Sequence, residues 1–233
     1  LIILLMRLQE RPLYKMRLIV LDTETTGLDF NDGHKIIEIG CVEIINRKIT
    51  NNIYHQYIRP NKMIDDKARE IHGITNEFLE DKPLFSEIIN QFIQYLSDSD
   101  LIMHNAPFDV GFLKKELENA KHDPDLIDGR RNVYDTLKIA RNINPGKRNT
   151  LDALCDRYSI DREARDRHGA LLDASLLANV YLKMTMGQTN ISGLSETSKE
   201  LQRSETQLID NRKQRVISAD KEEVADHQNY FNK

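Results

Sequence analysis

Runs of apolar residues separated by short polar turns open the ordered part of this chain. Residues 18–21 are four aliphatic side chains in a row, which is typical of a strand buried on both faces. Residues 36–45 and 49–58 are rich in isoleucine and in other β-branched or aromatic residues, so they are further strand candidates. Three strands joined by short turns predict an antiparallel meander, which Pro60 ends.

After the meander, the pattern changes to helices that alternate with short strands. Residues 65–79 are mixed, with Thr75 as a helix cap. The elements predicted beyond it are a helix at 84–96, a strand at 101–103, a helix capped by Asn105 with Pro107 in its first turn, a polar connection at 122–131, a strand at 132–134, and helices at 135–143, 151–158 and 169–184. Helices between strands favour parallel pairing. The whole pattern predicts an α/β fold with a mixed sheet of about five strands flanked by helices.

Beyond residue 186 the apolar pattern stops. Residues 187–207 are dominated by Gly, Ser, Thr, Gln, Asn and charged residues, which predicts a flexible linker. Residues 208–233 recover a few apolar positions, too few for a core. They are therefore either a disordered end or a peptide that becomes ordered on a partner.

Length and composition fit one sizeable domain with a tail. The 233 residues are 39% hydrophobic and 30% charged, and no apolar run approaches the roughly 20 residues that a membrane-spanning helix needs. The first six residues are too short for a signal-peptide core and lack a basic segment ahead of them. We therefore expect a cytoplasmic protein, not a membrane protein, with a folded domain at 16–186. The extension at 1–15 is uncertain, because Met6 or Met16 could be the start residue.

The net charge of −4 does not indicate a nucleic-acid binder, since phosphate neutralisation normally requires a basic excess. A polyanionic substrate would have to meet local basic groups or metal ions. Lys147 and Arg148 resemble phosphate ligands, although a basic pair beside a Pro-Gly turn is more often solvated. Cys41 and Cys155 lie in apolar contexts without neighbours at metal-ligand spacing, which predicts buried free thiols.

Four acidic residues are predicted to point inward. Asp22 and Glu24 end the first strand two residues apart, so their side chains point the same way; they are either a solvated strand end or a pair that holds a cation. Asp109 and Asp173 each stand at the head of the apolar stripe of a helix, although an acid there often only satisfies backbone donors. Four such carboxylates without a matching buried lysine or arginine favour a metal site. All-oxygen ligation suits Mg²⁺ or Mn²⁺ better than zinc.

His168 precedes Asp173 by five residues. On a continuous helix, at ~100° per residue, these side chains would point roughly 140° apart, so His168 is expected in the loop before the helix. Gly169 makes such a break easy. With an unperturbed pKa near ~6.5, a histidine there can accept a proton from water at neutral pH. A lone loop histidine is usually polar surface, and this one gains significance only from the four acids.

Three segments resemble the motifs of the DEDD exonuclease superfamily, in the subtype with histidine five residues before the last aspartate: Asp22-Thr-Glu24-Thr-Thr-Gly27, Asn105-Ala-Pro-Phe-Asp109 and His168-Gly-Ala-Leu-Leu-Asp173. Three more resemble the proofreading subunits of bacterial DNA polymerase III: residues 34–40, 72–74 and 146–155. The resemblance covers residues 16–187 closely and the tail loosely.

This resemblance implies a ribonuclease H-like fold and the removal of nucleotides from a 3′ DNA end by hydrolysis with two divalent cations, Mg²⁺ or Mn²⁺. It also implies that Asp22 binds both cations, that Glu24 and Asp173 complete one site, that Asp109 acts largely through water, and that His168 is the general base. A mispaired terminus separates from its template more easily than a paired one, so an enzyme that needs a single-stranded 3′ end favours errors.

The resemblance further implies contacts with the substrate from Asp22, Glu24, Thr25, His72, Asn105 and Phe108. Phe108 and His72 are the candidates for packing against the terminal nucleotides, because base stacking tolerates any sequence; the alternative for Phe108 is ordinary core. Lys67 stands where the family usually has a glutamate that helps to hold the substrate end, which puts that contact in question.

The expected partner is the polymerase catalytic subunit, which would bind residues 208–233 and keep the exonuclease close by. A small accessory subunit and the sliding clamp are further candidates. Residues 188–191 resemble a clamp-binding peptide only weakly, because the expected aromatic residue is missing. Two alternatives stay open: an exonuclease that trims RNA with the same residues, and a structural polymerase subunit with a decayed site. The intact acids and histidine argue against decay.

Overall fold

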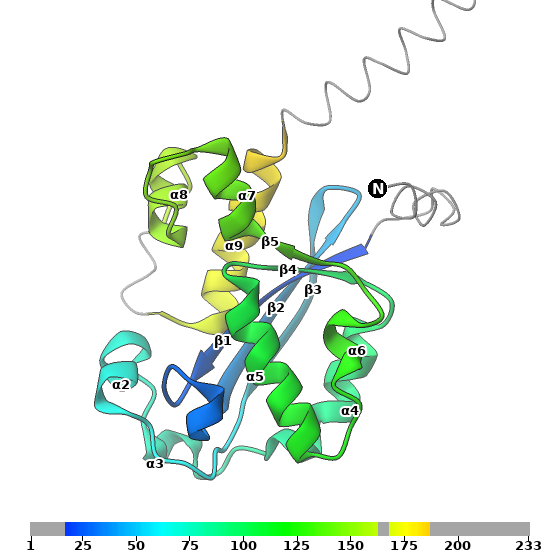
Figure 1. Ribbon diagram of the computed structural model, residues 1–233, viewed down its shortest axis with the longest axis vertical. Coiled ribbons are helices and arrows are strands. Elements are labelled where there is room, and N and C mark those ends of the chain that lie inside the picture. Colours follow the sequence, from blue (N-terminus) through cyan, green and yellow to red (C-terminus); the bar gives the residue numbers. More distant parts are fainter. Residues whose placement is uncertain (1–16, 163–167, 187–233) are drawn as a thin grey trace, which may run out of the picture. The chain divides into compact units, whose positions relative to one another are not determined.

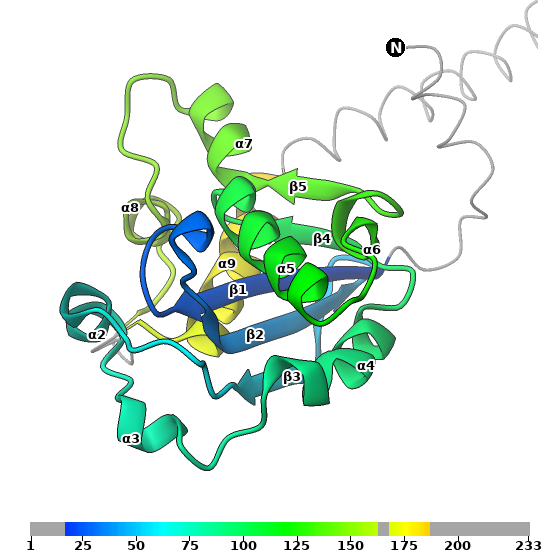
Figure 2. The same cartoon turned by 60° about the horizontal axis from the view of Figure 1, so that its bottom comes forward.

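Five strands form one mixed sheet in the order β3-β2-β1-β4-β5 (Figures 1 and 2). The computed structural model describes residues 17–162 and 168–186. Its strands are β1 (Arg17–Thr25), β2 (Ile36–Ile45), β3 (Lys48–Tyr57), β4 (Asp100–Met103) and β5 (Val133–Asp135). The first three pair antiparallel, whereas β4 pairs parallel with β1 and β5 parallel with β4. The predicted meander and the mixed sheet are confirmed.

The helices fill the connections that the apolar pattern indicated. They are the 3-10 turn η1 (Phe30–Asp32) and the helices α2 (Asp66–His72), α3 (Asn76–Leu79), α4 (Phe85–Leu96), α5 (Ala106–Asn119), α6 (Asp125–Asp128), α7 (Thr136–Ile143), α8 (Leu151–Arg157) and α9 (Ala170–Met184). Thr75 caps α3 through its hydroxyl oxygen, as predicted, and Thr150 caps α8 in the same way. Within the described ranges, no helix is both long and apolar enough to cross a membrane.

The sheet is covered on both faces. Ile19 and Leu21 of β1 pack in the cluster that contains α4 and α5, whereas Leu18 and Val20 pack against α9. Figure 2 shows α5 and α9 on opposite sides of β1. This alternation explains why β1 reads as an uninterrupted apolar run, because a strand with helices on both faces has no solvent-facing side.

Four local features differ from the predictions. The helices α2 and α6 were not predicted, because each is a single short, polar element with one buried residue, His72 or Ile127. Asn105 occupies the N-cap position of α5 in a left-handed conformation (φ 69°) and makes no side-chain capping bond. Gly169 is extended (φ −160°), a conformation open to any residue, so the break before α9 does not depend on glycine.

Cys41 and Cys155 are buried thiols, as predicted. The proposed boundaries of the exonuclease domain, linker and docking tail remain predictions. Residues 1–15, 187–207 and 208–233 lie outside the described part of the chain.

Candidate active site

The four predicted carboxylates come from three elements that meet at one end of β1. Asp22 and Glu24 lie on β1, Asp109 lies in the first turn of α5, and Asp173 lies in the first turn of α9. Asp109 is 2% exposed and Asp173 is 4% exposed. Both side chains are therefore buried, although Asp109 also accepts hydrogen bonds from backbone N–H groups. The position of an acid at the head of an apolar stripe correctly predicted an inward carboxylate in both cases.

Asp22 is at the centre of this acidic group. Burial raises the pKa of the Asp22 carboxyl well above its usual range, and the charges of Asp109, Glu24 and Asp173 raise it further, in that order. Repulsion among buried carboxylates disfavours their shared ionisation unless a cation neutralises them. A divalent cation is the simplest group that would do so.

Asp109 is held by the strand beside it. The Thr23 hydroxyl donates to Asp109 Oδ1 at 2.8 Å. Burial raises the pKa of Asp109 to about 7, although the hydrogen bond from Thr23 acts in the opposite direction. Because alternate residues of a strand face opposite sides, Thr23 reaches α5 while Asp22 and Glu24 point to the other face. One strand end thus supplies two carboxylates and orients a third.

His168 lies in the loop before α9, as predicted, and contacts the acid that follows it. Its Nδ1 is 3.0 Å from Asp173 Oδ2, and its backbone N–H donates to the carbonyl of Ile71 at 3.3 Å. The His168 side chain is 45% exposed, whereas Asp173 is buried. Glu24, His168 and Asp173 each offer a ligand atom within 4.8 Å of the others. This separation, with mostly oxygen donors, fits a divalent cation.

A cavity of about 570 Å³ opens over this group. Its lining residues are Asp22, His104, Asn105, Leu137, Arg141, Lys147, Asn149, Thr150, Leu151, His168 and Asp173. Three of these residues belong to the predicted site: Asp22, Asp173 and His168. The opposite wall comes from α7, α8 and the loop between them. An acidic floor beneath a rim with two basic side chains can hold a cation and an anionic ligand together.

The residues predicted to contact a substrate are not all at the cavity. Asn105 lines it. Thr25 is buried with its hydroxyl donating to the carbonyl of Gly27, and Phe108 is half-buried with its ring 4.9 Å from that of Phe112. Lys67 is exposed on α2. The cavity lining thus brings together Asp22, Asp173, His168 and Asn105. The other predicted site residues are not among the lining residues: Glu24, Lys67, His72, Thr25, Phe108 and Asp109.

His72 is buried beside this region. Its Nδ1 accepts a hydrogen bond from the Ile74 N–H at 3.0 Å. Burial lowers the pKa of His72, although a backbone hydrogen bond with Thr25 and the charge of Glu38 act in the opposite direction.

His104 and Arg141 line the cavity but were not recognised from the sequence. His104 ends β4, and its Nδ1 is 2.9 Å from the Thr136 hydroxyl at the start of α7. Burial lowers the pKa of His104. The signal for His104 was its place at the carboxyl end of a parallel strand, where ligands of α/β folds usually bind. Arg141 carried no comparable signal, because an exposed basic side chain on a helix is an ordinary feature of a protein surface.

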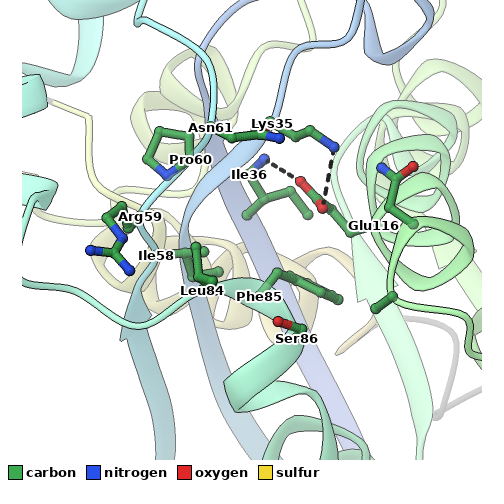
Figure 3. A pocket seen from close by; sticks show the side chains of 12 residues that line it. Lys35, Ile36, Ile58, Arg59, Pro60, Asn61, Leu84, Phe85, Ser86 and Glu116 are labelled. Atoms are coloured by element: carbon green, nitrogen blue, oxygen red, sulfur yellow. Dashed lines mark hydrogen bonds and ion pairs between the residues drawn. The ribbon is translucent and has the colours of Figure 1, made fainter.

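A second cavity, of about 270 Å³, lies away from these residues (Figure 3). It is bounded by Ile36, Ile58–Asn61, Leu84–Ser86 and the C-terminal part of α5. Its buried acid, Glu116, accepts a hydrogen bond from the Ile36 N–H at 3.3 Å and pairs with Lys35 at 3.6 Å. These groups satisfy one another, so this cavity offers no reactive side chain.

The mixed sheet and the acid–histidine site define the class of the protein: residues 19–181 match the family model described as Exonuclease. The chain is 46% identical over 220 residues to the DNA polymerase III subunit epsilon of Salmonella typhimurium, covering 91% of this chain and 90% of that protein. It is 54% identical over 181 residues to the corresponding subunit of Pasteurella multocida, covering 75% and 70%. This chain belongs to the family of DNA polymerase III epsilon subunits, the 3′-to-5′ proofreading exonucleases.

Solved structures agree with the fold. Exonuclease X in complex with 5′ overhanging duplex DNA has a TM-score of 0.57 at 28% identity, covering 76% of this chain and 93% of that one. A full-length 3′-exonuclease has a TM-score of 0.63 at 20% identity, covering 75% and 84%. These likenesses confirm the predicted ribonuclease H-like arrangement of the sheet and helices.

Proposed function

We propose that Asp22, Glu24, Asp109 and Asp173 hold two divalent cations, Mg²⁺ or Mn²⁺, and that His168 is the general base for hydrolysis at a 3′ DNA end. The observation that carries this proposal is the setting of Asp22, whose carboxyl is shielded from solvent among four other acids that all raise its pKa: Asp109, Glu24, Asp173 and Glu38. Without a cation, a carboxylate in such surroundings lowers the free energy of unfolding, because neighbouring negative charges repel it. The oxygen donors of the set favour a hard cation.

Bound there, the cations would supply Lewis acidity to the attacking water and to the leaving 3′ oxygen. The role of the protein is to hold the carboxylates that bind the cations in place. Thr23 orients Asp109, and the first turn of α9 carries Asp173. In the reaction, the water oxygen forms a bond to phosphorus and the bond from phosphorus to the 3′ oxygen breaks. The products are a nucleoside 5′-monophosphate and a new 3′ hydroxyl.

His168 takes the proton of the attacking water. Its Nδ1 lies 3.0 Å from a carboxylate oxygen of Asp173, which can only accept while ionised, so in the neutral ring the proton is on Nδ1 and Nε2 is the basic nitrogen. A half-exposed loop position gives the ring room to turn toward bound substrate.

The cavity would receive the 3′ nucleotide. Asn105 on its wall would position the sugar and base, and Arg141 and Lys147 would face the phosphates. Thr25, His72 and Phe108 are not lining residues and are proposed as substrate contacts only from the resemblance of the sequence motifs. Lys67 is exposed on α2, so the contact that a glutamate makes in related exonucleases is not proposed for it.

Residues 208–233 are proposed to bind the polymerase catalytic subunit through the linker 187–207. The similarity to the Salmonella subunit covers 91% of the chain, so it continues beyond the exonuclease domain into this segment. A chain truncated after Gly187 should keep its nuclease activity and lose co-purification with the catalytic subunit. A truncated chain that still co-purifies would contradict this role, and the full-length chain is the control.

Digestion of end-labelled oligonucleotides tests the nuclease proposal. With Mn²⁺, the purified full-length chain should release mononucleotides from single-stranded and mispaired DNA faster than from matched duplex. The Asp22→Ala variant should release none, while its circular dichroism spectrum stays the same as that of wild type. Faster release from RNA than from DNA would favour the RNA-trimming alternative. No release by a folded wild-type chain that binds the polymerase would favour a structural subunit, and retained activity of Asp22→Ala would refute the metal ligands.

A further inference from the structure

Glu38 is a buried acid beside the site that is not one of the four proposed metal ligands. It lies on β2 directly opposite Glu24 of β1, and it is 2% exposed. Residues 38, 40 and 42 share one face of β2, and Val42 of this set packs in the cluster that contains α9. Glu38 therefore points toward the same side of the sheet as α9.

The first turn of α9 receives its capping interaction from this acid. Gly169, the residue at the N-cap position, has no side chain that could accept from the helix. Instead, the Ala170 N–H donates to Glu38 Oε2 at 3.2 Å, across 132 residues of sequence. The first N–H groups of a helix have no partner within the helix, and the positive end of the helix dipole favours an anion there. Glu38, on the sheet, thus accepts the hydrogen bond that the side chain of the N-cap residue would normally accept.

The carboxylate of Glu38 is itself oriented by β3. The His55 Nε2 is 2.7 Å from Glu38 Oε1, so the two oxygens have different partners. Tyr57 borders the same acid: burial raises the pKa of the Tyr57 hydroxyl, followed by the charge of Glu38 and a hydrogen bond to it. The rings of His55 and Tyr57 meet edge to face at 4.9 Å between centroids. Glu38 is therefore fixed from two directions.

Ala170 lies between two residues of the proposed reaction. His168 is two residues before it and Asp173 is three residues after it, so the position of this first turn determines where both side chains stand relative to Asp22 and Glu24. We infer that Glu38, oriented by His55, is a positioning residue for hydrolysis: it holds the first turn of α9 on the sheet, so that His168 and Asp173 face the carboxylates of β1. The inference rests on the proposed function of that site.

Glu43 provides a matched control. It is also a buried acid of β2, 5% exposed, but its partners are Arg17 at 2.6 Å, Thr50 at 2.7 Å and Asn52 at 3.0 Å, none of which belongs to α9. Replacing Glu43 tests the loss of a buried acid from the same strand without disturbing the helix that carries the site. A purely structural role for Glu38 predicts the same behaviour for both positions.

The experiment compares Glu38→Ala, Glu38→Gln, Glu43→Ala and wild type in steady-state digestion of single-stranded DNA with Mn²⁺, below the melting temperature of every variant. Glu38→Ala should lower kcat by about tenfold or more with KM within about threefold, because misplacement of reacting groups by about 1 Å has effects of that size or larger. Glu38→Gln keeps an acceptor for Ala170 and should restore most of kcat. Glu43→Ala should melt at a lower temperature than wild type but keep its kcat.

Hydrogen exchange of the metal-free, full-length chain gives a second readout that needs no activity. Amides at the start of α9 should exchange faster in Glu38→Ala than in wild type and at the wild-type rate in Glu43→Ala. Equal kcat values for the two alanine variants, or unchanged exchange at the start of α9, would overturn the inference. A wild-type chain without nuclease activity would instead overturn the proposed function. The hydrogen-exchange result would still show whether Glu38 stabilises the start of α9. If Glu38→Ala does not fold, Glu38→Asp, whose shorter side chain withdraws from Ala170, takes its place in both measurements.

Discussion

Gly40 of β2 lies directly against Ala170 at the start of α9: a Cβ built on Gly40 would be 2.2 Å from the Ala170 carbonyl carbon. Gly40 also stands opposite Asp22 in the antiparallel register of β1 and β2. The absence of a side chain at Gly40 therefore allows the helix that carries Asp173 to approach the strand that carries Asp22.

Gly40→Ala is expected to push the first turn of α9 away from the sheet. Overpacking of this kind typically lowers the free energy of unfolding by about 1–3 kcal/mol. Because the displaced turn holds Asp173, kcat should fall as well. Thermal unfolding and DNA digestion measure the two effects.

Gly169→Ala is the control for that change. Gly169 is extended and a Cβ there meets no atom within 4 Å, so the substitution causes no overpacking and should lower the free energy of unfolding less than Gly40→Ala does. If the two alanine variants were equally stable and equally active, close approach at Gly40 would not be what positions α9.

Asp22→Asn should have opposite effects on activity and on the stability of the metal-free protein. The amide cannot replace the carboxylate as a cation ligand, so hydrolysis should stop. The same change removes a desolvated charge that four neighbouring acids repel, so the unfolding temperature in EDTA at pH 8 should rise. Differential scanning fluorimetry with and without Mn²⁺ measures this, and the cation should stabilise wild type more than Asp22→Asn. A variant that is less stable than wild type in EDTA would contradict the repulsion argument.

The pH dependence of the metal-free protein follows from Asp109. Its pKa is about 7 in the folded chain, because of burial, against ~3.9 for an unfolded aspartate. Between these values the folded state holds a proton that the unfolded state has released. The contribution of this Asp109 proton to the free energy of unfolding is therefore fully present below pH ~4. It is lost as pH rises through about 7, at up to about 1.4 kcal/mol per pH unit.

In EDTA, the unfolding temperature of wild type should consequently fall more steeply between about pH 5.5 and 7.5 than that of Asp109→Asn, which cannot titrate there. Mn²⁺ should reduce this difference, because cations bind the deprotonated acids. Parallel pH profiles of wild type and Asp109→Asn in EDTA would contradict the raised pKa.

Much of the fold and the centre of the site follow from local sequence patterns. The strand at residues 18–21 and the acids Asp109 and Asp173 could be predicted because the period of each element fixes which way a side chain points. The contacts that complete the site could not. Glu38 meets Ala170 across 132 residues, and nothing in either segment specifies the other. His104 and Arg141 share a cavity only because β4 and β5 lie side by side in the sheet.

Lys147 and Arg148 show the same limit for neighbouring residues. The sequence presents them as an equivalent basic pair that is more often solvated than functional. In the structure, Lys147 lines the cavity together with Asp22, whereas Arg148 is not among the lining residues and its carbonyl accepts a hydrogen bond from Arg157. Only Lys147 is therefore expected to meet a phosphate of the DNA strand.

Lys147→Ala should raise KM for single-stranded DNA without a matching loss of kcat, because it removes attraction to the strand and leaves the acids and His168 in place. It should also reduce the slope of log KM against log salt by about 0.7, the value for one phosphate contact on a single strand. Arg148→Ala removes the same charge one residue away and should change neither quantity. Digestion rates over a range of NaCl concentrations measure both variants. Equal shifts in KM and in salt slope would mean that the basic pair acts only through its overall charge, and that Lys147 does not contact the strand from the cavity wall.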